Sequence, residues 1–451
     1  MDYLDTLSQF SSNLDYQKLD AEVQDQVGWI LADTVAAMAA GSAEPELRAI
    51  ANRQVQVSSK HAAQLIGLGA CSTPEAAAFI NGTSGTFLEM DEGNRFSRGH
   101  PAVHVIPAAL ALSQEREASA ENFLAAMVVG YEVGSRLGAA SQLRGAMHPH
   151  GTWGTIGAGA ASARVAGMQA SDMRQTINIA ASLTTATSKQ TMLEGGLVRN
   201  VYAGLSNRNG LLALNLAECG FTGEHDGPSS LLGKIISESF QPDAVTQGLG
   251  QDWHLMRNYF KLHSCCRYNH GTLDAIDQMA AVHALPSPDD IDRIEVTTYH
   301  LAAELNDPAP NNTLAAKFSV PFAVATRIVN NSSALSSFTW DAVRNPHTLA
   351  LAQKVSVLHD PAMSARLPNE RPATVTLYLK DGTSRTGQAG VNRGDDASPY
   401  TREELRQKFM NLTSRIWPTA HCETMLQATL DLANLKVSFQ TWSQLLAHSA
   451  K

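Results

Sequence analysis

The sequence predicts a mainly α protein, in which a large all-α helical domain holds an inserted, smaller α+β domain. Helical apolar spacing fills roughly the first 265 residues, β-branched alternation begins only near residue 290, and helical spacing returns after residue 400. A chain of 451 residues is also too long for one compact core. We therefore expect three segments: 1–267 for the first part of the all-α domain, 268–400 for the α+β domain, and 401–451 for C-terminal helices that return to the helical domain.

The helices of the first part follow one another along the chain. A helix is predicted from Asp20 to Gly41, and another starts with Thr73 as its N-cap and Pro74 at its first position. No convincing strand pair is expected before about residue 265. The remaining helices of this part are predicted over 118–140, 154–168, 171–186 and 207–220.

The β signals come next. The segment Ile291–His300 alternates and is rich in β-branched residues, so it predicts a strand, while Pro372–Gly390 predicts a hairpin with Asp381 and Gly382 in its turn. A helix over 316–329 is expected between them. Three apolar residues should share one face of the first hairpin strand: Val375, Leu377 and Leu379.

Two amphipathic helices end the chain. The first covers 398–417 and should be capped near Thr401, and the second covers 420–435. We expect both of them to pack on the helical domain.

Composition excludes several classes of protein. With 17% charged and 44% hydrophobic residues the chain is globular, and a net charge of −9 without a basic run argues against nucleic acid or an anionic membrane as partner. Neither a secretory signal nor an apolar run long enough to span a membrane is present. Five scattered cysteines suit a reducing compartment, so we expect a cytoplasmic protein.

Charge is concentrated in a few short segments. Residues 88–101 read LEMDEGNRFSRGHP between two apolar stretches, which predicts either a solvated loop or the rim of a site for charged small molecules. Three further clusters hold polar residues in glycine-rich or apolar settings. Their main members are His148 and His150, then Arg199 and Tyr202, then Lys261 and Cys266.

Each cluster also has a structural interpretation. Tyr202 could be a core residue, Lys261 could extend along apolar surface, and adjacent cysteines are usually buried and inert. A metal site is conceivable because His100 and His104 are four residues apart, but Pro101 interrupts a helix between them. The sequence contains no Rossmann or P-loop signature, and we expect neither a metal nor a cofactor.

Seven segments, in order, resemble the MmgE/PrpD family, which includes 2-methylcitrate dehydratase, cis-aconitate decarboxylase and iminodisuccinate epimerase. The resemblance covers nearly the whole chain. The segments are AAAFINGTSGTFLEMDE, GHPAVHVIPAALALSQ, MHPHGTWGTIGAGAASARVAG, KLHSCCRYNHGTLDAI, AAKFSVPFAVA, LKDG and RGDDASPYTREELRQKF.

The resemblance implies a large all-α domain holding both chain ends, a smaller α+β domain, a homodimer, and a site between the domains. The family's acidic position falls on Glu89 and Asp91, and its site histidines fall on His100 and His148. Its site lysine falls on Lys261, and another lysine position holds Arg199. Two departures weaken the dehydratase and decarboxylase interpretations: Gly93 replaces a threonine, and Cys266 stands at the position of a histidine.

The family reactions move a proton at a carbon flanked by carboxylates. Such a site needs fixed cations for the developing charge and a general base and acid within reach. Our first choice is a lyase, either a dehydratase or a decarboxylase, acting on a small di- or tricarboxylate. An epimerase and a non-catalytic carboxylate binder stay open. We expect catalytic roles for His148, Lys261, His100 and Tyr202, and substrate contacts from Glu89, Asp91, Arg95, Arg98, Arg199 and Cys266.

Overall fold

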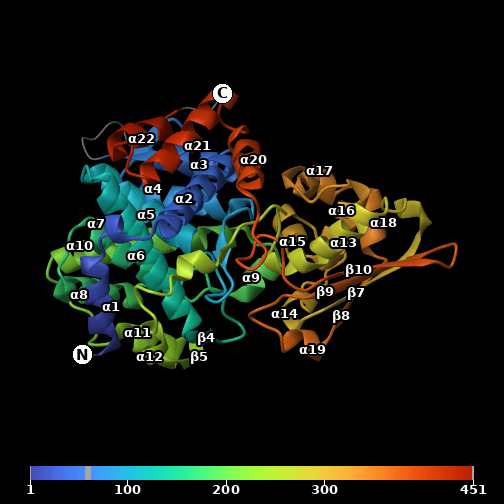
Figure 1. Cartoon of the computed structure of the whole chain (residues 1–451), viewed down its shortest axis with the longest axis horizontal. Coiled ribbons are helices and arrows are strands. Elements are labelled where there is room, and N and C mark those ends of the chain that lie inside the picture. Colours follow the sequence, from blue (N-terminus) through green and yellow to red (C-terminus); the bar gives the residue numbers. More distant parts are fainter. Residues whose placement is uncertain (1, 56–61, 449–451) are drawn as a thin grey trace.

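The computed structural model describes residues 2–55 and 62–448. It consists of a helical body and a smaller α+β lobe, which stand side by side in Figure 1. The α+β lobe comprises strands β7–β10 and helices α13–α19. The predicted mainly α fold with a smaller α+β part is confirmed.

Small residues let the central helices of the body pack closely. An added Cβ at Gly157 of α7 would meet the carbonyl oxygen of Gly130 on α6 at 2.7 Å, so this crossing requires glycine. The central helices are α2 (Ala21–Gly41), α4 (Pro74–Phe87), α5 (Pro101–Glu115), α6 (Ala120–Ala139), α7 (Trp153–Val165) and α10 (Val201–Glu218). The shorter helices around them are α1 (Tyr3–Asn13), α3 (Pro45–Gln54), α8 (Ala170–Ser182), α9 (Lys189–Leu193), α11 (Gly227–Ser230) and α12 (Pro242–Val245).

The expectation of no strand pair before residue 265 is wrong. Three two-stranded antiparallel sheets occur there: β1 (Ala63–Leu65) with β2 (Ala70–Ser72), β3 (Gly93–Asn94) with β6 (Asn258–Tyr259), and β4 (Ser141–Leu143) with β5 (Ser237–Phe240). Strands of two to four residues are too short to show alternation. In two of these sheets the partner strand also lies far away in the sequence.

The α+β lobe is built on one four-stranded sheet in the order β10-β9-β7-β8. Strand β8 runs parallel to β7 and the other pairs are antiparallel. The predicted strand and hairpin are confirmed, whereas β8 was not predicted. The strands are β7 (Ile291–Thr298), β8 (Val355–His359), β9 (Ala373–Leu379) and β10 (Ser384–Ala389). The helices are α13 (His270–Val282), α14 (His300–Ala303), α15 (Thr313–Lys317), α16 (Val320–Val329), α17 (Trp340–Val343), α18 (Pro346–Ala352) and α19 (Pro361–Ser364).

The hairpin follows from its sequence. Gly382 has a φ of +87°, the left-handed conformation that glycine adopts most easily, and its N–H donates to the carbonyl of Leu379. Val375 and Leu377 are fully buried against helices α13 and α16, and Leu379 is half-buried beside them. The predicted apolar face is therefore confirmed. The predicted helix over 316–329 is divided into α15 and α16, because Ser319 caps a new helix there.

The last helices of the described chain pack on the body. Thr401 caps α20 (Arg402–Thr413) in a capping box with Glu404, so the predicted cap is confirmed. Helices α20 and α21 (Thr419–Ala433) pack against α2, and α22 (Phe439–Leu446) joins the same core (Figure 1). Within residues 2–55 and 62–448, no helix combines the length and apolar character that crossing a membrane requires.

Candidate active site

The charged segment 88–100 is buried rather than solvated. Glu89 is 1% exposed, Asp91 2% and His100 8%, and Arg95 is buried as well. Arg98 is the exception, because its side chain is exposed. Burying so many charges costs free energy unless each one is paired with an opposite charge. The partners of these charges therefore explain how the segment can be buried.

Contacts from distant parts of the chain hold the segment in place. Glu89 follows α4 with a φ of 55°, which is strained for a residue other than glycine. The preceding carbonyl, that of Leu88, accepts hydrogen bonds from Ser264 Oγ (2.8 Å) and Lys317 Nζ (3.3 Å). The short sheet β3–β6 then pairs Gly93 with Tyr259. This pairing brings the chain around residue 261 alongside the acidic residues.

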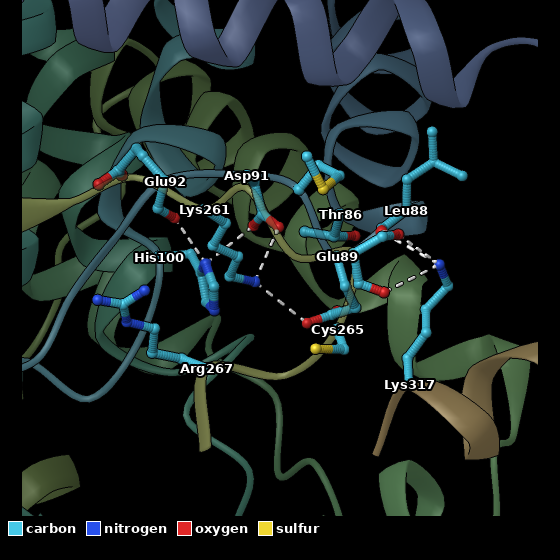
Figure 2. A network of polar contacts seen from close by, with 12 residues as sticks. Thr86, Leu88, Glu89, Asp91, Glu92, His100, Lys261, Cys265, Arg267 and Lys317 are labelled. Atoms are coloured by element: carbon cyan, nitrogen blue, oxygen red, sulfur yellow. Dashed lines mark hydrogen bonds and ion pairs between the residues drawn. The ribbon is translucent and has the colours of Figure 1, made fainter. Parts of the chain in front are cut away.

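The acids and cations form one buried network. Lys261 Nζ lies 3.3 Å from Glu89 Oε2 and 3.7 Å from Asp91 Oδ1, and Arg199 forms an ion pair with the other oxygen of Glu89. Figure 2 shows Lys261 between the two carboxylates. Burial alone would raise the pKa of Glu89, but Arg199 and Lys261 outweigh it and hold that pKa below its ordinary value. Conversely, the carboxylates outweigh burial and raise the pKa of Lys261, so Lys261 stays charged.

The surroundings of His100 fix its tautomer. Its Nδ1 lies 3.0 Å from Asp91 Oδ2 and 2.6 Å from the carbonyl oxygen of Glu92, both of which are acceptors. Nδ1 must therefore carry a hydrogen, which leaves the lone pair of the neutral ring on Nε2. His100 lines the cavity described below, so this arrangement suits a general base.

His148 is held in the opposite way. The backbone N–H of His150 donates to His148 Nδ1 at 3.1 Å, and Arg199 Nε lies 3.4 Å from His148 Nε2. Both ring nitrogens of His148 thus face N–H donors, and a neutral ring can accept from only one of them at a time. Burial, together with the positive charge of Arg199, holds the pKa of His148 well below its ordinary value. His148 is therefore a neutral ring beside the fixed charge of Arg199.

Glu89, His100, His148 and Arg199 border a cavity of about 460 Å³ between the helical body and the α+β lobe. Seven lysine or arginine side chains line it against only two carboxylates, those of Glu89 and Glu238. A pocket with this balance favours anionic ligands. The seven cationic side chains are Arg95, Arg98, Arg144, Lys189, Arg199, Arg267 and Arg371.

The predicted site residues fall into two layers. Seven of them line the cavity: Glu89, Arg95, Arg98, His100, His148, Arg199 and Cys266. Asp91, Lys261 and Tyr202 are not among its lining residues. Lys261 and Asp91 lie behind Glu89 and His100, and the ring of Tyr202 lies 5.8 Å from that of His148. Asp91, Lys261 and Tyr202 would therefore act on a bound ligand only through the residues that line the cavity.

The two departures from the family pattern have structural counterparts. A side chain at Gly93 would overlap the hydroxyl of Tyr259, a cavity residue, so a hydroxyl occupies the space beside this glycine. Burial raises the pKa of the Cys266 thiol to about 11 and the negative charge of Glu89 adds to this effect, so Cys266 is protonated at neutral pH. Cys266 therefore lacks the thiolate that a nucleophile needs.

Several lining residues were not predicted. They include Tyr259, Tyr268, Arg144, Lys189 and Arg371. Arg371 comes directly before the predicted hairpin, but nothing local marks it as a ligand residue, because its place at the cavity depends on how the α+β lobe packs on the body.

The histidine spacing does not form a metal site. Helix α5 begins at Pro101, and His100 precedes it with φ −125° and ψ 78°, so His100 and His104 do not share a helical face. Among the residues described, the group with metal-ligand spacing is His263, Asp274 and Asp277. Asp277 already pairs with Arg327 at 2.7 Å, and none of the three lines the cavity.

Comparisons with known proteins agree with this architecture. A family model described as the MmgE/PrpD N-terminal domain matches residues 5–229, and one described as the MmgE/PrpD C-terminal domain matches residues 263–432. The first match covers most of the helical body. The second covers the α+β lobe and extends into helices α20 and α21.

Similar proteins of known name cover most of the chain. A cis-aconitate decarboxylase of Aspergillus terreus is 23% identical over 458 residues, spanning 94% of this chain and 92% of the relative. The protein of the same name in Mus musculus is 26% identical over 393 residues, spanning 80% of this chain and 76% of the relative. The one in Homo sapiens is 24% identical over 384 residues, spanning 80% and 77%.

Proposed function

The chain belongs to the MmgE/PrpD family, and from this premise we propose that it is a cofactor-independent acid–base enzyme acting on a small di- or tricarboxylate. Our first choice is a lyase of the methylcitrate or cis-aconitate type. The names of the similar proteins, all cis-aconitate decarboxylases or a protein described as like one, support a lyase.

One observation carries this proposal: a histidine with a free lone pair and a fixed cation line the same cavity. Asp91 and the Glu92 carbonyl hold the hydrogen of His100 at Nδ1 and leave the lone pair on Nε2, and Arg199 lies beside His148 at the cavity wall. The ring of His100 can accept a proton, and the cation can stabilise the negative charge that develops on a carboxylate. Reactions at a carbon beside carboxylates need both groups.

The proposed mechanism assigns each group a task. The substrate carboxylate beside the reacting carbon binds Arg199, whose charge stabilises the negative charge that builds up when the C–H bond breaks. His100 Nε2 accepts the proton, and Asp91 stabilises the resulting imidazolium. In dehydration, the imidazolium of His100 returns the proton to the departing hydroxide, which leaves as water. In decarboxylation, the bond to the departing CO₂ breaks and its electron pair goes to carbon, which takes a proton from the protonated form of His100.

An epimerase stays a second candidate because of how the two histidines are arranged. His100 directly precedes α5 and His148 precedes α7, so the two rings reach the cavity from separate segments, and the ring of His150 lies 5.0 Å from the first and 4.6 Å from the second. Epimerisation needs proton transfer at both faces of one carbon, and two such rings could supply it. A substrate bound between them would favour this candidate.

Proton exchange in D₂O tests the proposal. The protein would be incubated with methylcitrate, cis-aconitate and the iminodisuccinate stereoisomers, and ¹H NMR would follow both deuterium uptake and net products. We expect deuterium at a carbon next to a carboxylate for at least one substrate, undiminished by a chelator. Binding of these acids without any exchange or product would refute the enzyme and leave a carboxylate-binding protein.

We also propose that the protein works as a homodimer in the cytoplasm. The homodimer rests on the family resemblance, and the location rests on the five cysteines, which are all unpaired. Light scattering coupled to size-exclusion chromatography would test the homodimer, and a single-chain mass at micromolar concentration would contradict it.

A further inference from the structure

Arg371 is the one buried cation at the cavity wall that has no carboxylate partner within the described chain. It is 5% exposed, it lines the cavity, and its Nη1 has no hydrogen-bond partner in residues 2–55 and 62–448. Arginine is always charged, and a buried charge without an anion is costly. This cost is offset if an anion from outside the chain binds there.

The surroundings of Arg371 hold it rigidly in place. Its backbone N–H donates to the carbonyl of Gly390 (3.2 Å), and its own carbonyl accepts from Asn392 Nδ2 (3.3 Å). Gly271 lets α13 pass beside it, because an added Cβ there would lie 2.5 Å from the Arg371 carbonyl oxygen. The guanidinium carbon lies 5.6 Å from the ring centres of both Tyr259 and Tyr268. A cation fixed in this way is preorganised for a ligand.

The other cations at this end of the cavity are already engaged. Asp395 lies 2.9 Å from Arg267 and 3.5 Å from Arg95, and Asp396 lies 2.6 Å from Arg95. Arg371 shares no such contact. The exposed side chain of Arg98 also lines the cavity, and no carboxylate pairs with it in the chain as described.

The place of Arg371 relative to the proposed base suggests what it binds. The Tyr259 ring centre lies 6.1 Å from that of His100 and 5.6 Å from the Arg371 guanidinium carbon, so both residues border the same ring. We propose that Arg371, assisted by Arg98, holds a carboxylate of the substrate that does not react, while Arg199 and the two histidines act at the other end. This inference rests on the proposed function and assigns to Arg371 the recognition of the substrate carboxylate that lies away from the reacting carbon.

Citrate binding tests the inference, because it needs no proton transfer. Isothermal titration at fixed ionic strength would compare the wild type with Arg371→Gln and with Arg293→Gln. Arg293 is a matched control: it lies on β7, beside the strand β9 that begins two residues after Arg371, and its guanidinium carbon lies 3.7 Å from the Tyr378 ring centre. It is exposed and does not line the cavity. We expect Arg371→Gln to weaken citrate binding roughly ten- to a hundredfold, as the loss of hydrogen bonds to a charged group does. Arg293→Gln should change the affinity for citrate less than twofold.

If Arg371→Gln does not fold, judged by circular dichroism, Arg371→Lys keeps the charge but loses the planar fork and should still bind citrate at least threefold more weakly. A crystal structure of the citrate complex should show a carboxylate bound to Nη1 of Arg371. The inference is overturned if the wild type binds no citrate, if the folded Arg371 variant keeps wild-type affinity, or if Arg293→Gln loses as much. Citrate binding at Arg371 without deuterium exchange would refute the proposed reaction and leave the carboxylate subsite standing.

Discussion

Asp91 and His100 form a buried pair in which a carboxylate oxygen lies 3.0 Å from Nδ1 of the imidazole ring. Lys261 lies on the other side of the same carboxylate, 3.7 Å from its second oxygen. Burial would raise the pKa of Asp91, but His100 and Lys261 outweigh it and lower that pKa. Asp91 thus stays an anion at neutral pH and fixes the orientation of the His100 ring, which lines the cavity.

Replacing His100 with glutamine should abolish most of the activity. Glutamine is close in size but cannot accept a proton, and a well-placed general base contributes about 10²–10⁴-fold in rate. We expect turnover of the best substrate, measured by NMR, to fall by at least about 10²-fold with its binding less affected. His347→Gln, a change at an exposed histidine of α18, is the control and should leave turnover unchanged. Near-normal activity of His100→Gln would remove His100 from the mechanism.

His148→Ala should also lower turnover by at least about 10²-fold, since it removes the ring that Arg199 contacts at the cavity wall and with it the exact position of that cation. The pKa of His148 lies well below its ordinary value, so this ring stays neutral from pH 7 to pH 9. The rate that remains in His148→Ala should therefore keep the wild-type dependence on pH over this range. A limb of the pH–rate profile that disappears in His148→Ala would show that His148 itself titrates, contrary to this assignment.

Local sequence patterns predicted the fold well. The capping box at Thr401, the turn at Gly382 and the alternation of β9 each depend on residues a few positions apart, so their signals can be read directly. Strand β8 could not be found in this way, since it is a short edge strand that pairs with β7 across five intervening α-helices.

The candidate site was predicted less completely. The charged segment and the histidines were found from composition, but the contact of Lys261 with Glu89 joins residues 172 positions apart. This contact depends on the sheet β3–β6, whose strands are only two residues long and therefore show no pattern in the sequence. Arg371 lies still further along the chain, and only the packing of the α+β lobe on the body brings it to the cavity. Whether a cation faces the ligand or stands behind another residue likewise depends on tertiary packing.

Lys261→Ala should affect both stability and activity. Lys261 is fully buried between two carboxylates, and removing one partner of a buried ion pair typically costs about 3–5 kcal/mol. We expect the free energy of unfolding in urea to fall by an amount of this order, and turnover of the folded protein to fall by at least about 10²-fold because Glu89 and Asp91 lose their position. Lys18→Ala removes a lysine from an exposed ion pair with Asp15 and should change neither quantity appreciably. Full activity in Lys261→Ala would show that the position of the two acids is unimportant.

Asp91 should make the protein sensitive to acid. Its pKa is lower in the folded protein than the ordinary value of about 3.9, so its contribution to stability is present above that value and is lost as the pH falls through the folded pKa. The free energy of unfolding in urea, measured between pH 6 and pH 3, should fall as the pH is lowered. It should fall less steeply in Asp91→Asn than in the wild type. Asp292→Asn, at an exposed aspartate of β7, should follow the wild type. Equal slopes for wild type and Asp91→Asn would contradict the charged state assigned to this carboxylate.

Cys266 should contribute little to catalysis, although it lines the cavity. Its pKa of about 11 leaves almost no thiolate at pH 7, and the thiolate is the reactive form. Iodoacetamide at pH 7 should therefore modify the exposed Cys219 well before Cys266, which peptide mass spectrometry would resolve. Cys266→Ser should keep turnover within about threefold of the wild type, because general acid–base catalysis by the histidines does not use the thiol. Complete loss of activity in Cys266→Ser, together with rapid alkylation of Cys266, would instead point to a covalent mechanism with this thiol as the nucleophile.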